Sequence, residues 1–308
     1  MTMRKLFVMA VAAALLYGCE KEINVEEHAT IETTDGTVVD LGPTKKFTFT
    51  MKGDFGNAVF VDAEETRGNR AAKYLDAAGN EMTDLWVFDY MGGTCIQTIH
   101  QTASDEAWGH PSLPLAYGSH HVYFVASRGV EPTLDATAKT ITWTKPRDTF
   151  WKDYEVEVVS TSNGNRAVTL ERVVTKLKVT IDDEIPTDIA SISLTPATWY
   201  CGLNYQTGAP AGQVSNQERT VSVPANYVGT TGTLTTSIFG FSAATEWTTD
   251  VVITAKDGNS ATLGTATITD AAFKRNRASE YSGPLFGSAG AATVSIEDGW
   301  LDALTGSW

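Results

Sequence analysis

The chain has 308 residues, of which 42% are hydrophobic and 19% charged, so it can bury a sizeable core and is too apolar for wholesale disorder. Its 37 acidic and 23 basic residues give a formal net charge of -14, which repels phosphate backbones and excludes nucleic acid as an expected partner. Three cysteines without a Cys-x-x-Cys motif argue against a disulfide framework. At roughly 100 to 200 residues per domain, the length predicts two domains.

The first residues have the pattern of an export signal. Arg4 and Lys5 precede the apolar run Leu6 to Leu16, which is shorter than the ~20 residues that a membrane span needs. The run ends in Leu16-Tyr17-Gly18-Cys19, which resembles a bacterial lipobox. We therefore predict a lipoprotein signal peptide over residues 1–18 and a lipid on Cys19 that holds the chain in the outer membrane. The alternative is an ordinary secretory signal that contains a cysteine.

The next segment is polar and acidic. Glu20 to Thr44 contains no aromatic residue and ends near Gly42-Pro43, which predicts a flexible acidic tether over residues 19–45. Glu20, Lys21 and Glu22 resemble the acidic surface-export tags of Bacteroidetes lipoproteins, although generic tether acidity explains them equally well. We expect the protein at the cell surface.

Residues 46–170 alternate with a period of two and predict a first β-sandwich. The Asn163-Gly164 pair predicts a hairpin turn. Ala71 to Ala78 could form one helical turn. The predicted strands are Phe47–Met51, Leu85–Tyr90, His121–Ala126, Ile141–Thr144 and Tyr154–Val159.

Residues 171–308 predict a second sandwich, with the boundary near Leu170. Val173, Thr175, Leu177, Val179 and Ile181 share one face of its first strand. Asp298 to Leu304 could form a helical turn. Further strands are predicted at Ala190–Leu194, Thr220–Val223, Gly232–Phe241, Val251–Ala255, Ala261–Thr269 and Thr293–Ile296, with a turn at Asp257-Gly258. The predicted fold class is all-β.

No local motif indicates catalysis or a cofactor. A Gly-x-Ser-x-Gly elbow, a phosphate-binding loop and a dinucleotide fingerprint are all missing from the sequence. His120 and His121 are neighbours on a predicted strand and point to opposite faces, so they cannot bind one metal together. We expect no enzyme activity, no catalytic residue, no metal and no cofactor, although a glycosidase cannot be excluded by motif because its two carboxylates meet only in the folded chain.

Three aromatic residues near a turn are the best candidates for stacking against a sugar. They are Trp199, Tyr200 and Tyr205. Core packing is the competing interpretation, because aromatic side chains in a sandwich mostly fill the interior.

Four segments together carry a family resemblance. They are Met82 to Tyr90, Leu170 to Ile181, Phe273 to Gly287, and the lipobox with its acidic tether. In these segments the chain resembles the fimbrillin and fimbrillin-anchor family of type V pili from Bacteroides-like bacteria. The resemblance implies two tandem transthyretin-like sandwiches and a cell-surface fimbrial subunit that supports adhesion. Its partners would be other fimbrial subunits and a host or bacterial surface ligand.

The resemblance also implies assembly by β-strand exchange. In that family a protease cuts shaft subunits after an arginine behind the first strand, and a strand from another subunit fills the vacated groove. Arg67 and Arg70 are the candidate cut positions here. Glu297 to Trp308 does not alternate as a long donor strand should, which favours an anchor or accessory subunit. The alternatives are a processed shaft or tip fimbrillin and, in another class, a surface glycan-binding lipoprotein of a sugar-uptake system.

Overall fold

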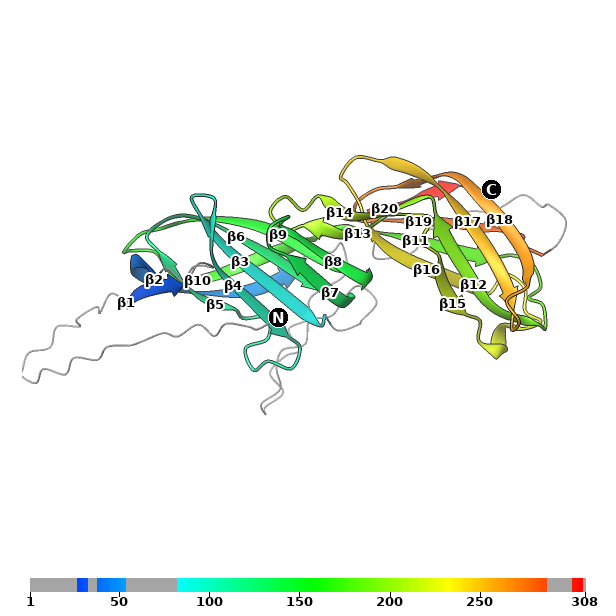
Figure 1. The fold of residues 1–308 in the computed structure, drawn as a ribbon, viewed down its shortest axis with the longest axis horizontal. Helices are drawn as coiled ribbons and strands as arrows, with labels where there is room; N and C mark the ends of the chain where they lie inside the picture. The colour runs from blue at the N-terminus through cyan, green and yellow to red at the C-terminus, as the bar shows by residue number, and fades with distance from the viewer. Residues whose placement is uncertain (1–26, 33–37, 54–81, 287–300, 307–308) are drawn as a thin grey trace, which may run out of the picture.

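The computed structural model describes residues 27–32, 38–53, 82–286 and 301–306, and these residues form strands and connecting turns with a short 3-10 turn, η1 (Ala225–Tyr227). Figure 1 shows two β lobes along the long axis of the molecule. The strands of the first half are β1 (Glu27–Glu32), β2 (Val38–Gly53), β3 (Asp84–Met91), β4 (Thr94–Thr102), β5 (Ser112–Ala116), β6 (Gly118–Ser127), β7 (Val130–Asp135), β8 (Thr140–Lys145), β9 (Thr149–Val158) and β10 (Asn165–Arg172).

The second half is also built from strands. They are β11 (Val174–Ile181), β12 (Ile189–Pro196), β13 (Thr198–Asn204), β14 (Pro210–Ser215), β15 (Arg219–Ser222), β16 (Leu234–Phe241), β17 (Trp247–Asp257), β18 (Thr262–Phe273), β19 (Arg277–Gly283) and β20 (Leu301–Gly306). The predicted all-β class with two sandwiches is confirmed.

The first sandwich closes around β2. This strand pairs in parallel with β10 and antiparallel with β5, while the other layer has the order β9-β6-β3-β4. β10 joins the two layers, because its last residues, Glu171 and Arg172, pair with β9. The core between the layers includes Phe47, Phe49 and Phe124, all completely buried.

The second sandwich repeats this plan. Its first strand, β11, pairs antiparallel with β16 and in parallel with β19, as β2 does with β5 and β10. The other layer has the order β15-β12-β17-β18, matching β4-β3-β6-β9 of the first sandwich. The face of β11 predicted to be apolar is buried, and Lys176 and Lys178 lie on the other face.

The two sandwiches share a small sheet at their junction. The β7–β8 hairpin follows β6, the β13–β14 hairpin follows β12, and β8 pairs with β13, giving the order β14-β13-β8-β7. A separate apolar cluster lies under this sheet and includes Phe88, Trp143, Tyr205 and Phe241. We call the sheet and this cluster the seam.

Two predictions at the ends of the chain are corrected. The segment predicted as a tether contains β1 and the first part of β2, which pair with each other. Their ladder is interrupted beside Gly42, which has a φ of +72°, so the Gly42-Pro43 pair lies at an irregularity within β2 instead of ending a tether. The helical turn predicted at Asp298 to Leu304 is also wrong, because β20 begins at Leu301. The predictions at Ala71–Ala78 and Thr293–Ile296 lie outside the described residues.

Candidate functional site

The groove occupied by β2 is the candidate functional site. Thr44 to Thr48 pair with β5, and Thr48 to Gly53 pair with β10. Backbone hydrogen bonds beyond the regular ladders add to this, since the amide of Thr48 donates to the carbonyl of Gly164 at 2.7 Å and that of Phe49 to Pro111 at 3.0 Å. β2 is therefore an interior strand, held on both edges by its main chain.

The side chains of β2 alternate, as the predicted strand requires. Phe47, Phe49 and Met51 are 0%, 0% and 4% exposed, whereas Thr48 and Thr50 are only half-buried. The Phe49 ring packs edge-on against Phe124, with the ring centres 5.2 Å apart. Each large apolar side chain buried in this way contributes roughly 1.5 to 3 kcal/mol relative to exposure.

The walls of the groove come from β5 and β10. Leu113 and Leu115 of β5 and Val168 and Leu170 of β10 are 0 to 1% exposed and belong to the same cluster as the β2 side chains. If β2 were removed, β5 and β10 would lose their ladder partner, and the core side chains that pack against β2 would be exposed to water. The site therefore has the requirements of a strand-binding groove: main-chain donors and acceptors together with pockets for alternate side chains.

Gly164 allows β2 to approach. A Cβ added at this position would lie 2.1 Å from the carbonyl oxygen of Lys46, a distance that side chains do not tolerate. The hairpin turn predicted at Asn163-Gly164 is wrong: the turn after β9 lies at Ser160-Thr161, neither Asn163 nor Gly164 has a positive φ, and Asn165 to Leu170 pair with β2. The Asn163 side chain accepts a hydrogen bond from the amide of Asn165 at 3.0 Å. The glycine is required for the close contact with β2, a function that the turn pattern did not reveal.

Several predicted site residues lie outside the described residues. These are the lipid-attachment residue Cys19 and the candidate cleavage residues Arg67 and Arg70. Their assignments remain predictions. Within the described ranges no helix is long and apolar enough to cross a membrane.

The three candidate sugar-stacking residues are split between packing environments. Trp199 is 2% exposed and packs edge-on against Phe273, and Tyr205 is 1% exposed with its ring stacked on Phe88 at 3.9 Å. Tyr200 is half-buried and meets Trp247 edge-on. Neither Trp199 nor Tyr205 offers a free ring face, so the structure favours the core-packing interpretation for both.

His120 and His121 point to opposite faces of β6, as predicted. His120 is 1% exposed, and its ring nitrogens lie 2.6 Å from Asp89 Oδ1 and 3.0 Å from the carbonyl oxygen of Ala116. His121 is exposed and lies beside Asp153 and Glu155. Among the described residues, the donor atoms of these three side chains come close enough together to hold a metal ion. The sequence search could not find this group, because its members lie on two strands far apart in the chain.

Comparison with known proteins gives matches only among solved structures. No protein-family model and no curated protein matches the chain. A candidate adhesin from Bacteroides ovatus is 11% identical, with a TM-score of 0.48 over 84% of this chain and 96% of that one. The fimbrial anchor protein Mfa2 from Porphyromonas gingivalis is 9% identical, with a TM-score of 0.39 over 74% of this chain and 83% of its own. The tip fimbrial protein Mfa3 from the same organism is 13% identical, with a TM-score of 0.39 over 78% and 95%.

Proposed function

We propose that this chain is a lipid-anchored, non-enzymatic fimbrial subunit of the cell surface, of anchor or accessory type, which assembles with other subunits by β-strand exchange and supports adhesion. The observation that carries the proposal is the position of β2. A strand near the N-terminus fills a groove between β5 and β10, and it is joined to the remainder of the sandwich through the segment that contains Arg67 and Arg70. Two of the similar solved structures carry the names of a fimbrial anchor and a fimbrial tip protein, the class of role proposed here.

The groove supports strand exchange for a physical reason. β2 binds through main-chain hydrogen bonds on both edges and through Phe47, Phe49 and Met51 in the core. A strand from another subunit with the same alternation would satisfy the same groups. A vacated groove would accept such a strand, whereas a groove that keeps β2 ends the polymer at that point.

The C-terminal strand favours the anchor or accessory role. β20 spans Leu301–Gly306 and pairs in parallel with β19 of its own chain. β2 meets its two neighbours over a longer stretch, from Thr44 to Gly53. The six described residues of β20 cannot replace all the contacts that β2 makes, so the proposal places this chain at the end of a fimbrium, with Cys19 fixing it to the outer membrane.

The test is the intact mass of the protein recovered from the outer membrane of its native host and from sheared fimbriae. The proposal expects one membrane-bound species that begins at acylated Cys19 and retains β2. A delipidated species that begins at Gly68 or Ala71 would instead establish a processed shaft or tip subunit. The Arg67→Ala/Arg70→Ala variant should still begin at acylated Cys19, with its mass changed only by the two substitutions, if the anchor role holds.

The lipid needs its own control. A Cys19→Ala variant should leave the outer membrane and appear in the soluble fraction, while a Cys95→Ala variant should stay at the membrane. Retention of Cys19→Ala in the outer membrane would contradict the lipid anchor without affecting the groove.

A further inference from the structure

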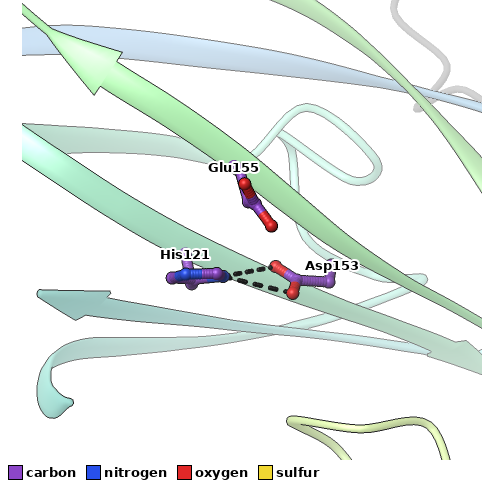
Figure 2. Close-up of side chains that lie close together, drawn as sticks. All are labelled: His121, Asp153 and Glu155. Carbon is purple, nitrogen blue, oxygen red and sulfur yellow. Dashed lines mark hydrogen bonds and ion pairs between the residues drawn. The ribbon is translucent and has the colours of Figure 1, made fainter.

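A histidine and two carboxylates meet on the outer face of the first sandwich. β6 and β9 pair antiparallel from Gly118 opposite Val158 to Ser127 opposite Thr149. In this register His121 lies directly opposite Glu155, and Asp153 lies two positions further along the same face of β9. Figure 2 shows the three side chains pointing toward one another from these two strands.

The donor atoms are close. His121 Nδ1 lies 3.1 Å from each carboxylate oxygen of Asp153. One donor atom from each of the three residues lies within 4.8 Å of the others. Ligand atoms around a tetrahedral zinc ion at ~2.0 to 2.2 Å lie roughly 3.3 to 3.6 Å apart. Rotation of the exposed side chains would close this difference.

The surroundings hold the imidazole in place. The His121 ring stacks nearly parallel on Tyr123, with centroids 5.9 Å apart and an interplanar angle of 15°. The backbone is also ordered, because β6 pairs with β3 on one edge and with β9 on the other over the whole stretch that contains the site. The side chains of His121 and Asp153 are 48% and 26% exposed, so a hydrated ion can reach them.

Negative charge collects at this position. Asp153 and Glu155 both lie on the outer face of β9, two positions apart. Within the described ranges, no lysine or arginine forms an ion pair with either carboxylate. Glu157 extends the acidic surface on the same face of β9, where its carboxylate accepts a hydrogen bond from Ser119. A cation would relieve this repulsion.

We propose that His121, Asp153 and Glu155 form a surface site for a zinc-class divalent cation. One imidazole and two carboxylates suit Zn²⁺ better than Ca²⁺ or Mg²⁺, which prefer sets made only of oxygen ligands. Three protein ligands leave a fourth position for water or for a side chain of another molecule. The site lies on the outer face of β6 and β9, whereas the core of the first sandwich lies on their inner face. It does not depend on the groove of β2.

The test is titration of the untagged mature protein with Zn²⁺ alone, by calorimetry, after treatment with a chelator. We expect one equivalent to bind, and we expect His121→Ala and Glu155→Gln each to weaken binding by at least about tenfold. Ca²⁺ and Mg²⁺ should bind at least about tenfold more weakly than Zn²⁺. Co²⁺ in place of Zn²⁺ should give the visible absorption of a tetrahedral site, and this absorption should disappear in both variants.

His100→Ala is the matched control. His100 lies on the neighbouring part of the same sandwich and pairs with a carboxylate, Asp84, at 2.8 Å, but it is not part of the three-residue group. The His100→Ala variant should bind Zn²⁺ as tightly as the unaltered protein does. The proposal is overturned if no stoichiometric binding occurs, or if His121→Ala and Glu155→Gln bind as tightly as the His100→Ala control.

Discussion

At the scale of single residues, the buried His120 is a charged group in the core of the first sandwich. Both of its ring nitrogens lie beside oxygen atoms, those of the Asp89 carboxyl group and the Ala116 carbonyl, an arrangement that a doubly protonated ring satisfies. The other oxygen of Asp89 accepts a hydrogen bond from Gln97 Nε2 at 3.1 Å. Burial alone would lower the pKa of His120, but the hydrogen bond and charge of Asp89 outweigh it and raise the pKa above 6.5. His120 and Asp89 thus form a buried ion pair.

This ion pair predicts a pH dependence of stability. Because the pKa of His120 is raised by folding, its contribution is complete below the unfolded value of about 6.5 and is lost as the pH rises through the folded value. The free energy of unfolding of the unaltered protein should therefore fall toward that of His120→Gln as the pH rises above neutrality. Urea denaturation of both proteins in the presence of a chelator measures this difference. A difference that stays constant from pH 5.5 to about 9 would contradict the charged pair.

Arg172 joins the two sandwiches through a second buried ion pair. Its Nε and Nη2 donate to the two oxygens of Asp148 at 2.7 and 2.9 Å, and its Nη1 donates to Asn276 at 3.2 Å. The side chains of Arg172 and Asp148 are 1% and 4% exposed. Arg172→Met would leave the Asp148 carboxylate buried without its guanidinium partner. We expect a loss of about 3 to 5 kcal/mol in the free energy of unfolding, measured by urea denaturation.

An exposed pair provides the comparison for Arg172. Lys152 and Glu171 meet at 2.7 Å, with side chains 35% and 59% exposed. Lys152→Met should cost less than about 1 kcal/mol, because solvent screens such pairs. Equal losses in the two variants would show that the burial of Arg172 adds nothing.

At the scale of elements, Gly164 controls how tightly β2 is held. A methyl group at this position would collide with the Lys46 carbonyl, which cannot move without separating β2 from the start of β10. Gly164→Ala should therefore lower the free energy of unfolding by about 1 to 3 kcal/mol. It should also speed amide hydrogen exchange in β2 more than in β11. Both effects can be measured on one sample by denaturation and by exchange mass spectrometry.

Gly258→Ala is the matched control for this substitution. An added Cβ at Gly258 meets no atom within 4 Å. Its effect should stay within about 0.5 kcal/mol. If Gly164→Ala leaves exchange in β2 unchanged, the close approach does not hold the strand in place.

Local sequence predicted strands such as β11, which has one wet face. β11 alternates between buried aliphatic residues and half-buried lysines, so its period and its inner face could be read directly. β4 was not predicted, because both of its faces are polar or partly exposed at the edge of the sheet. β1 and the start of β2 resemble a tether, since their pairing with each other is not encoded by an apolar alternation. Such strands depend on partners distant in the chain.

The candidate sites were less predictable than the strands. The alternation of Phe47 and Phe49 identified the strand but not its groove, whose wall is the short segment β5 around Pro114. The group of His121, Asp153 and Glu155 exists only through the register of β6 against β9. Aromatic residues such as Trp199 have the same local appearance in a core and on a binding surface. Only the packing of the second sandwich decides between the two.

At the scale of the whole molecule, the seam joins the two sandwiches through one shared sheet. The sheet between them takes β7 and β8 from one half and β13 and β14 from the other (Figure 1). Tyr205 directly follows β13 and belongs to the apolar cluster; its hydroxyl meets that of Tyr90 at 3.0 Å and its carbonyl accepts a hydrogen bond from Trp151 Nε1 at 2.7 Å. The proposed fimbrial role would place the chain under force along its length, and a shared sheet resists bending better than a flexible linker.

Tyr205→Ala tests this coupling. It removes a fully buried ring stacked on Phe88 and should cost about 3 to 5 kcal/mol at the seam, while the cores of both sandwiches stay intact. We expect calorimetry to show one thermal transition for the unaltered protein and two for the variant, because each sandwich has its own apolar cluster. Tyr227→Ala, in η1 at a distance from the seam sheet, should keep a single transition. Two transitions in the unaltered protein would mean that the sandwiches unfold independently and that the seam does not couple them.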